Sequence, residues 1–255
     1  MTVHEIAASG FGAGADAYER SRPTYPDGAV AWLVDALAIR PGTIVADVAA
    51  GTGKLTRLLA PTGATLFAVE PVAGMRAQLA GALAGVPILA GAAEAVPFRD
   101  GSLDAITVAQ AIHWFDPERA LAEIHRVLRP GGRLGVIGNH RERSVPWVND
   151  VWTIVDRVER DAPRSHERSQ QSVFVDQSRF TTPVRSEFPN AQSLSTDEVV
   201  DRIRSISHVA ALPPGEKAEL LEEVRSVVTA HSPTAGDAAL LLPYRTDVCW
   251  VRRVD

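Results

Sequence analysis

Between residues 41 and 139 the sequence alternates between short apolar runs and amphipathic segments, and this alternation strongly constrains the fold. Strands are predicted at "TIVADV", "TLFAVE", "VPILAG", "LDAITVAQ" and "RLGVIGN", with helices at "GKLTRLLA", "VAGMRAQLAGAL" and "PERALAEIHRVL". Such alternation predicts βαβ units with right-handed crossovers. Because the strands are continuously apolar, both faces of the sheet should be buried. We therefore predict an α/β fold with a Rossmann-like, doubly wound, mostly parallel sheet.

The flanking segments predict a single domain that spans residues 1–255. Residues 1–40 should form an N-terminal arm and a helix, and residues 41–140 the core. Residues 141–235 should supply inserted cap helices, loops and one or more late strands, including one at "TPVRSEFP". Residues 236–255 read as a C-terminal strand, with "ALLLPYRTDVCWVRRV" forming either two strands or one long bent strand. Together with the core these strands predict a seven-stranded sheet, whose open end the cap helices should cover.

Composition narrows the class of protein and its surroundings. A net charge of −5 over 255 residues argues against nucleic acid as the main partner, because phosphate binding needs a basic face. No signal peptide is recognisable, and no apolar run approaches the ~20 residues that span a bilayer. The single cysteine, Cys249, excludes an internal disulfide and is expected to be a small buried hydrophobic residue. We predict a soluble cytoplasmic protein without a membrane partner or a bound metal, either a monomer or a homodimer.

The segment "VADVAAGTGKLT" carries the strongest chemical signal. A strand ends near Asp47, and Gly51 and Gly53 form a turn through which a ligand can approach the main chain before a helix begins. Glu70 follows the next strand, where an acid can accept both hydroxyls of a ribose. Leu55 after Lys54 excludes the phosphate-binding loop motif. The dinucleotide fingerprint also fails, because Thr56 stands where its third glycine belongs.

The segments "DVAAGTGKLT", "FAVEP", "GAAEAVPF", "SLDAITVAQAIHWF" and "EIHRVLRPGGRLGVI" resemble the successive motifs of class I S-adenosylmethionine-dependent methyltransferases. The resemblance covers about residues 44–139. The flanking segments "YERSRPTYP", "HWF" and "LPYRTDVCW" resemble a small-molecule subgroup that includes trans-aconitate and thiol methyltransferase-like proteins. The resemblance implies S-adenosylmethionine as the cofactor, S-adenosylhomocysteine as its product and a small molecule as the methyl acceptor.

The resemblance also implies positions for the cofactor. The methionine end would be held by Asp47 and by the main chain of Ala49, Ala50, Gly51, Thr52 and Gly53. Glu70 would bind the ribose, Pro71 would flank the adenine, Ala93 and Glu94 would meet its edge, and Gln110 would face the sulfonium. Two positions depart from the family pattern. Ala49 stands where most relatives have glycine, and Ala92 replaces the usual acceptor for the adenine amino group.

Aromatic and ionisable residues around the core are candidates for catalysis and acceptor binding. His113 and Trp114 follow the fourth strand, where open α/β sheets place their ligands. His113 is either a structural residue, a contact to acceptor or cofactor, or a general base. Further candidates are Tyr18 for catalysis, Arg22 for a lid over the cofactor, and Tyr25, His140 and Trp147 for the acceptor pocket. Each of these also has a purely structural interpretation.

Methyl transfer to an O-, S- or N-nucleophile of a small molecule, including a carboxylate or a secondary metabolite, is the leading hypothesis. A cofactor-binding protein of the same fold that does not methylate, or that regulates, is the alternative, because Ala49 and Ala92 weaken the family pattern. A nicotinamide-dependent oxidoreductase is a third alternative, disfavoured by the missing glycine.

Overall fold

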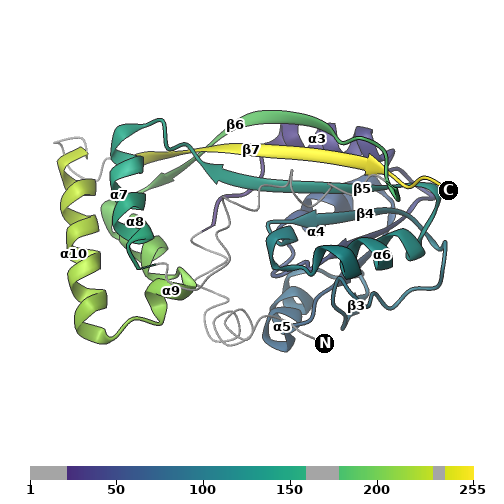
Figure 1. Ribbon diagram of the computed structural model, residues 1–255, viewed down its shortest axis with the longest axis horizontal. Coiled ribbons are helices and arrows are strands. Elements are labelled where there is room, and N and C mark those ends of the chain that lie inside the picture. Colours follow the sequence, from purple (N-terminus) through teal and green to yellow (C-terminus); the bar gives the residue numbers. More distant parts are fainter. Residues whose placement is uncertain (1–21, 159–177, 232–238) are drawn as a thin grey trace.

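Seven strands form one mixed sheet in a computed structural model that describes residues 22–158, 178–231 and 239–255 (Figure 1). The strand order is β3-β2-β1-β4-β5-β7-β6. The strands are β1 (Ile44–Val48), β2 (Thr65–Val69), β3 (Ile88–Leu89), β4 (Leu103–Ala109), β5 (Leu128–Arg141), β6 (Val184–Leu194) and β7 (Leu240–Arg252). β1 to β5 are parallel, and β7 runs antiparallel to both β5 and β6. The predicted Rossmann-like, mostly parallel, seven-stranded sheet is therefore confirmed.

Two groups of helices accompany the sheet. The first group is α3 (Asp27–Leu37), α4 (Lys54–Leu59), α5 (Ala73–Ala82) and α6 (Pro117–Val127), with 3-10 turns η1 (Ala60–Thr62) and η2 (Ile112–Trp114). The second group follows β5 in the sequence and contains α7 (Pro146–Asp156), α8 (Thr196–Arg204), α9 (Ser207–Ala210) and α10 (Pro214–His231). Their starts follow from local chemistry. Ser195 and Glu198 form a capping box at α8, while Asp116 accepts from Arg119 N at the start of α6.

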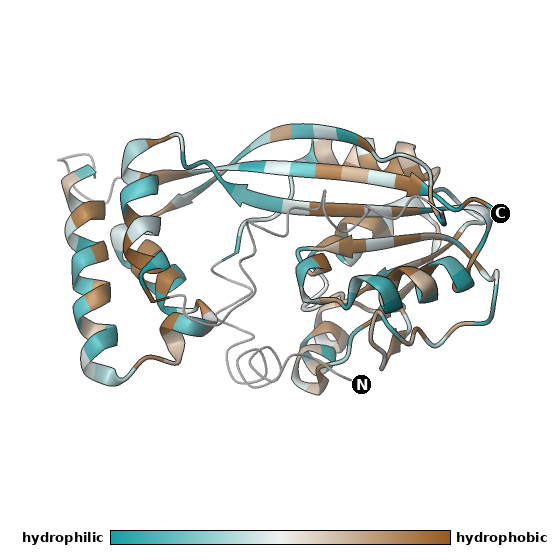
Figure 2. Cartoon of the chain, in the orientation of Figure 1, coloured by the Kyte–Doolittle hydropathy of each residue, from teal (hydrophilic) through white to brown (hydrophobic). Residues whose placement is uncertain are grey.

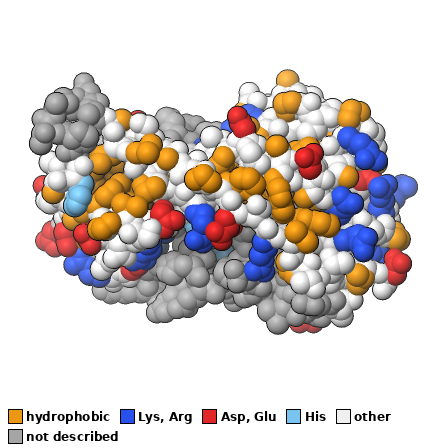
Figure 3. Space-filling view, turned by 90° about the horizontal axis from the view of Figure 1, so that it is seen from above, with side chains coloured by type: hydrophobic (Ala, Val, Ile, Leu, Met, Phe, Trp, Pro, Cys, Tyr) orange, Lys and Arg blue, Asp and Glu red, His pale blue; other side chains and the backbone are white. Residues whose placement is uncertain are grey.

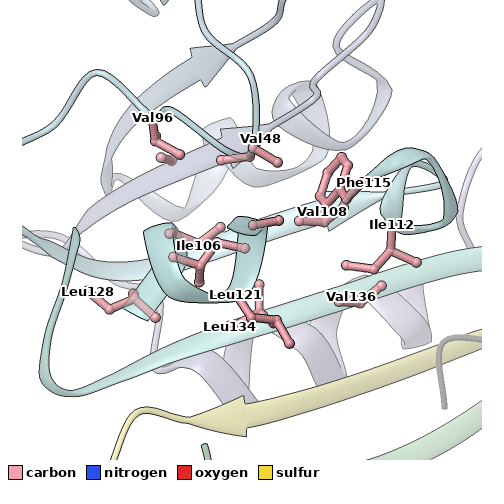
Figure 4. Close-up of a cluster of buried hydrophobic side chains, with 14 of the residues drawn as sticks. Val48, Val96, Ile106, Val108, Ile112, Phe115, Leu121, Leu128, Leu134 and Val136 are labelled. Carbon is pink, nitrogen blue, oxygen red and sulfur yellow. The ribbon is translucent and has the colours of Figure 1, made fainter. Parts of the chain in front are cut away.

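One buried cluster fills the space between the sheet and α6. Leu121 of α6 meets Ile106 and Val108 of β4 and Leu134 of β5 (Figure 4). Phe115 belongs to the same cluster and is only 7% exposed, which makes it a core residue. Cys249 is also buried there, as predicted, and burial raises the pKa of its thiol to about 12. A second cluster packs α3 and α4 against the sheet.

The second group of helices has a hydrophobic core of its own. Side chains of α7, α8 and α10 pack with Leu194 of β6 and with Leu240, Leu242 and Tyr244 of β7. α10 contacts both α7 and α8, and hydrophobic residues recur along these helices among hydrophilic ones (Figure 2). We call this group the cap. β5, β6 and β7 reach from the core to the cap, and the carboxyl end of β5 points toward it (Figure 1).

The structure also refines three strand predictions. β3 has only two residues and is an edge strand that pairs with β2 alone. β5 begins at Leu128 and includes the predicted "PGG" turn. The C-terminal segment forms one strand, since β7 pairs along its whole length with β5 or β6.

One face of the molecule, seen from above in Figure 3, combines hydrophobic and charged side chains. Val184 of β6 and Leu241 of β7 are the most exposed large hydrophobic residues in the described part of the chain, at 48% and 63%. Lys and Arg side chains are most frequent at the end of this face away from the cap (Figure 3). Acidic side chains lie among the others, so charges of both signs occur on this face.

Candidate cofactor site

Glu70 connects the two turns that follow β1 and β2. Its Oε2 accepts a hydrogen bond from Gly51 N at 2.9 Å, and its Oε1 accepts one from Val72 N at 2.8 Å. The side chain is 3% exposed, and burial raises its pKa despite these two hydrogen bonds and the nearby Arg76. A carboxylate has about four acceptor positions, so each oxygen can accept a further hydrogen bond. Glu70 therefore keeps acceptor capacity for two hydroxyls, which is the role predicted for it.

Asp47 is buried within β1 and bonded on both oxygens. Its Oδ2 accepts from Thr56 Oγ1 of α4 at 2.6 Å, and its Oδ1 accepts from Thr107 Oγ1 of β4 at 2.9 Å. Burial raises the pKa of Asp47 to about 6, and Glu70 adds to the rise, while the two hydroxyls oppose it. Asp47 thus ties α4, the helix after the glycine turn, to the neighbouring strand β4, a contact that the sequence does not indicate.

The two glycines of the turn, Gly51 and Gly53, differ in the space that a side chain would find. Gly53 has a φ of 84°, and an added Cβ would lie 2.2 Å from Leu79 Cδ1 of α5. Gly51 has a φ of 59°, but its nearest neighbour would be Met75 Sδ at 3.8 Å. A side chain at Gly53 would be disfavoured both by the positive φ and by the clash with Leu79. A side chain at Gly51 would be disfavoured by the positive φ alone, because the space beside Gly51 is not closely packed.

Two of the predicted cofactor positions, Ala49 and Gln110, have strained backbones. Three non-glycine residues in the described ranges have a positive φ, namely Ala38, Ala49 and Gln110, at 53°, 56° and 58°. Ala38 ends α3, where this conformation is common. Ala49 and Gln110 follow β1 and β4, which are adjacent in the sheet. Strained residues cluster at functional sites, so this pair independently marks the same edge of the sheet.

Gln110 is held in its conformation by β5. Its backbone N–H donates to Ile137 O at 3.0 Å, and its side-chain Nε2 donates to Asn139 O at 3.2 Å. The amide oxygen of Gln110 remains available to a ligand, since no hydrogen bond within the described ranges uses it.

The segment before α3 lies across the carboxyl ends of the strands. Lys54 Nζ donates to Arg22 O at 2.6 Å, and Asn139 Nδ2 donates to Thr24 O at 3.1 Å. Asn190 Nδ2 of β6 donates to the same oxygen at 2.9 Å. Arg22 is thereby placed beside the glycine turn and the strand ends. Tyr18, the tyrosine predicted to take part in catalysis, lies outside the described residues.

The loop predicted to meet the adenine is folded back on itself. Ala92 and Ala95 form an isolated bridge, and Ala93 is 3% exposed. Glu94 Oε1 accepts from Asp116 N at 2.9 Å, which links this loop to the start of α6. The remaining oxygen of Glu94 is a candidate acceptor for an adenine amino group.

The "HWF" segment divides between core and surface. His113 and Trp114 lie in η2, are partly exposed and have ring centroids 5.0 Å apart. Pro71, beside Glu70, is also partly exposed, which leaves its ring accessible to a flat ligand. His113 and Trp114 thus lie just beyond the strained Gln110, whereas Phe115 is core.

The three residues that were predicted to line the acceptor pocket lie in different parts of the molecule. Tyr25 is 4% exposed and packs in the cluster with α3, and Trp147 packs in the cap core. His140 lies inside β5, where its Nε2 is 3.5 Å from Asp247 Oδ2 of β7. Burial lowers the pKa of His140, while Asp247 raises it.

The described ranges hold no group of three or more His, Cys, Asp or Glu side chains that could bind a metal ion. Within the same ranges, no helix is both long and apolar enough to cross a membrane.

Known proteins are similar to this chain in sequence and in fold. Residues 46–136 match the family model described as a methyltransferase domain. An uncharacterized methyltransferase of Mycobacterium tuberculosis is 39% identical over 94% of this chain and 93% of its own. A methyltransferase-like protein of Schizosaccharomyces pombe is 33% identical over 90% of each chain. A solved structure from Anaeromyxobacter dehalogenans, assigned as a type II methyltransferase, superposes with a TM-score of 0.61 at 22% identity, over 91% of this chain and 97% of that one.

The chain belongs to the class I S-adenosylmethionine-dependent methyltransferases. It is an enzyme of the methyltransferase class, and its cofactor is S-adenosylmethionine.

Proposed function

We propose that this enzyme methylates a small-molecule acceptor that binds between the carboxyl ends of β4 and β5 and the cap. The observation that carries this proposal is the coincidence of Glu70, the glycine turn and the strained Gln110 at one edge of the sheet, with the cap beyond that edge (Figure 1). The finer assignment to a trans-aconitate or thiol methyltransferase-like subgroup rests on the flanking segments alone, and it stays a prediction.

The residues around the strand ends would share the work of holding the cofactor. Glu70 would accept the two ribose hydroxyls while keeping its hydrogen bonds to Gly51 and Val72. The main chain from Ala49 to Gly53 would contact the methionine portion, because Gly51 leaves its side open. Glu94 would accept from the adenine amino group in place of the family's usual residue at Ala92. S-adenosylmethionine, when bound, supplies an electrophilic methyl group on a sulfonium.

The main task of the residues on the acceptor side of the site would be to orient the nucleophile toward the methyl group. Positioning a nucleophile in line with the methyl group supplies several kcal/mol. Gln110 would present its amide oxygen near the sulfonium, since its backbone and Nε2 are held by β5. His113 would remove a proton if the acceptor is a hydroxyl or an amine, and would only shape the pocket if it is a carboxylate.

Calorimetry with S-adenosylmethionine, S-adenosylhomocysteine and NAD tests the cofactor half of this proposal. We expect binding of the first two compounds and none of NAD, and the opposite pattern would refute the proposal. Labelled S-adenosylmethionine with panels of carboxylates, thiols, phenols and amines tests the acceptor half. Transfer to a peptide or a nucleic acid instead of any small molecule would contradict it. The cytoplasmic location and a monomeric or homodimeric state remain predictions.

A further inference from the structure

Several hydrogen-bond donors are buried without acceptors where the cap meets the long strands. Arg202 of α8 is 2% exposed, and neither its Nε nor its Nη1 has a hydrogen-bond partner. Trp152 Nε1 of α7 and Tyr244 Oη of β7 are buried and unpartnered as well. Trp152 and Tyr244 both belong to the cap core, together with neighbours of Arg202 on α8. Buried polar groups without partners are rare and destabilising, so a concentration of donors calls for an explanation.

Arg141 brings a second positive charge to the same place. It is the last residue of β5 and lies directly opposite Tyr244 of β7. Its guanidinium carbon is 4.5 Å from the ring centroid of Trp152. Burial, together with the positive charges of Arg202 and Arg22, lowers the pKa of Arg141 to about 9, in keeping with guanidinium groups that lie near one another. Arg141 still carries its charge at neutral pH.

No carboxylate compensates these charges within the described residues. The side chains of Arg141 and Arg202 form no ion pair there. Asp156 is the acidic group that influences Arg141, but its Oδ2 is already bound to Arg143 at 2.7 Å. Arg204, two residues after Arg202 on the same helix, contrasts with it, because Arg204 is exposed and pairs with Asp201. A buried guanidinium is normally paired, so these charges call for an anionic partner that the described residues do not supply.

We propose that Arg141 and Arg202, with Tyr244 and Trp152, bind an oxyanion of the methyl acceptor, and that the acceptor is therefore a small organic anion. This inference rests on the proposed function. Guanidinium groups bind carboxylates and phosphates through paired hydrogen bonds, and Tyr244 and Trp152 supply further donors. We call this group of four residues the arginine cluster.

The position of the arginine cluster suits an anchor for the non-reacting end of the acceptor. Asn139, whose carbonyl holds Gln110, precedes Arg141 by two residues on β5. Two residues of a strand span about 7 Å. A small molecule whose oxyanion contacts Arg141 can therefore extend along β5 toward Gln110 with its nucleophile.

Thermal unfolding of the full chain tests the cluster without knowledge of the natural acceptor. Succinate and inorganic phosphate serve as oxyanion probes, and succinamide is the neutral control at equal ionic strength. We expect the melting temperature to rise with the concentration of at least one oxyanion and to be unaffected by succinamide, because a ligand that binds only the folded state stabilises it. A rise with succinate would indicate an acceptor with a carboxylate, and a rise with inorganic phosphate would indicate a phosphorylated acceptor. No rise with either oxyanion, or an equal rise with succinamide, would overturn the proposal.

Substitutions identify the residues responsible. Arg202→Met should raise the melting temperature of the free protein and abolish the rise that the oxyanion causes, because an unpaired buried charge is replaced by an apolar side chain of similar length. Arg141→Met and Tyr244→Phe should each weaken the response to the oxyanion. Arg204→Met is the matched control on α8. It should change neither the melting temperature of the free protein nor the rise that the oxyanion causes. An undiminished response to the oxyanion in both Arg202→Met and Arg141→Met would refute the assignment.

A kinetic comparison separates this inference from the proposed function. With any acid acceptor found in the panel, Arg202→Met should raise KM at least tenfold, while kcat changes less. The corresponding neutral amide should be methylated equally by both enzymes, or by neither. S-adenosylhomocysteine should bind the variant as it binds the unmodified protein. If that ligand binds neither, the proposed function fails; if it binds both and KM for the acid is unchanged, only the arginine cluster fails.

Discussion

Glu70 Oε2 accepts a hydrogen bond from Gly51 N over 2.9 Å, and this contact joins the turn after β1 to the turn after β2. The two halves of the cofactor motif, separated by 19 residues, are thus one structural unit. A residue expected to bind the ribose also supports the turn that would contact the methionine portion. Loss of its charge should therefore affect binding and folding together.

Glu70→Gln tests this double role. One oxygen of the carboxylate becomes an NH₂ group, so a buried backbone N–H loses its acceptor, which costs about 1–3 kcal/mol. We expect the free energy of unfolding to fall by about that amount and the affinity for S-adenosylhomocysteine to fall about tenfold or more. Urea unfolding and calorimetry measure the two effects. Glu118→Gln, on the exposed start of α6, is the control and should change neither. Unchanged affinity in Glu70→Gln would exclude Glu70 from the cofactor site.

Ala49→Gly should relieve backbone strain. Ala49 has a φ of 56°, a conformation that is unfavourable by roughly 1–2 kcal/mol for an L-residue with a side chain. Glycine removes this strain, although its greater freedom in the unfolded chain offsets about 0.4–1 kcal/mol of the gain. We expect a small rise in melting temperature and no loss of affinity for S-adenosylhomocysteine. Destabilisation by more than about 1 kcal/mol would show that the methyl group of Ala49 packs favourably.

Asp47 should make stability depend on pH in a defined direction. Burial raises its pKa from 3.8 to about 6, so between these values the folded protein binds more protons than the unfolded chain. Stability should therefore fall as pH rises through this window, by on the order of 3 kcal/mol. Glu70, whose pKa is also raised, contributes in the same direction.

Asp47→Asn removes the titrating group and should flatten this fall, leaving the part that Glu70 contributes. Unfolding by urea at pH 4, 5, 6 and 7 measures the slope for both proteins. An unaltered slope in Asp47→Asn would show that Asp47 does not titrate in this range.

His113→Ala distinguishes chemistry from structure. General base catalysis contributes about 10²–10⁴-fold, so loss of a base should lower kcat by at least about a hundredfold with a hydroxyl or amine acceptor. The affinity for S-adenosylhomocysteine should change by less than about threefold, since Glu70 and the glycine turn would still hold the cofactor. His231→Ala, at the exposed end of α10, is the control. Equal losses in turnover and affinity would instead indicate that His113 supports the site.

Much of the core could be predicted from local patterns. The β-branched runs, the glycine turn and the capping signals before α6 and α8 specify their own conformations, so the sheet and its first helices followed from periodicity. Phe115 needed the structure, because an aromatic residue after a strand, although more often part of a core, can also line a pocket. Only its packing among Ile106 and Leu121 decides for the core.

Local sequence patterns specify the alternation of strands and helices, the turn at Gly51 and Gly53 that a ligand can approach, and the acid at Glu70. These depend on backbone freedom, hydrophobic period and residue type, all of which are local. Tertiary packing produces the contact of Asp47 with Thr107, the positive φ of Gln110, and the placement of Arg141 over the ring of Trp152 and opposite Tyr244. Those contacts join residues up to 103 positions apart, from Arg141 to Tyr244. A contact of that span forms only when strand pairing and helix packing bring the segments together, and no local pattern encodes it.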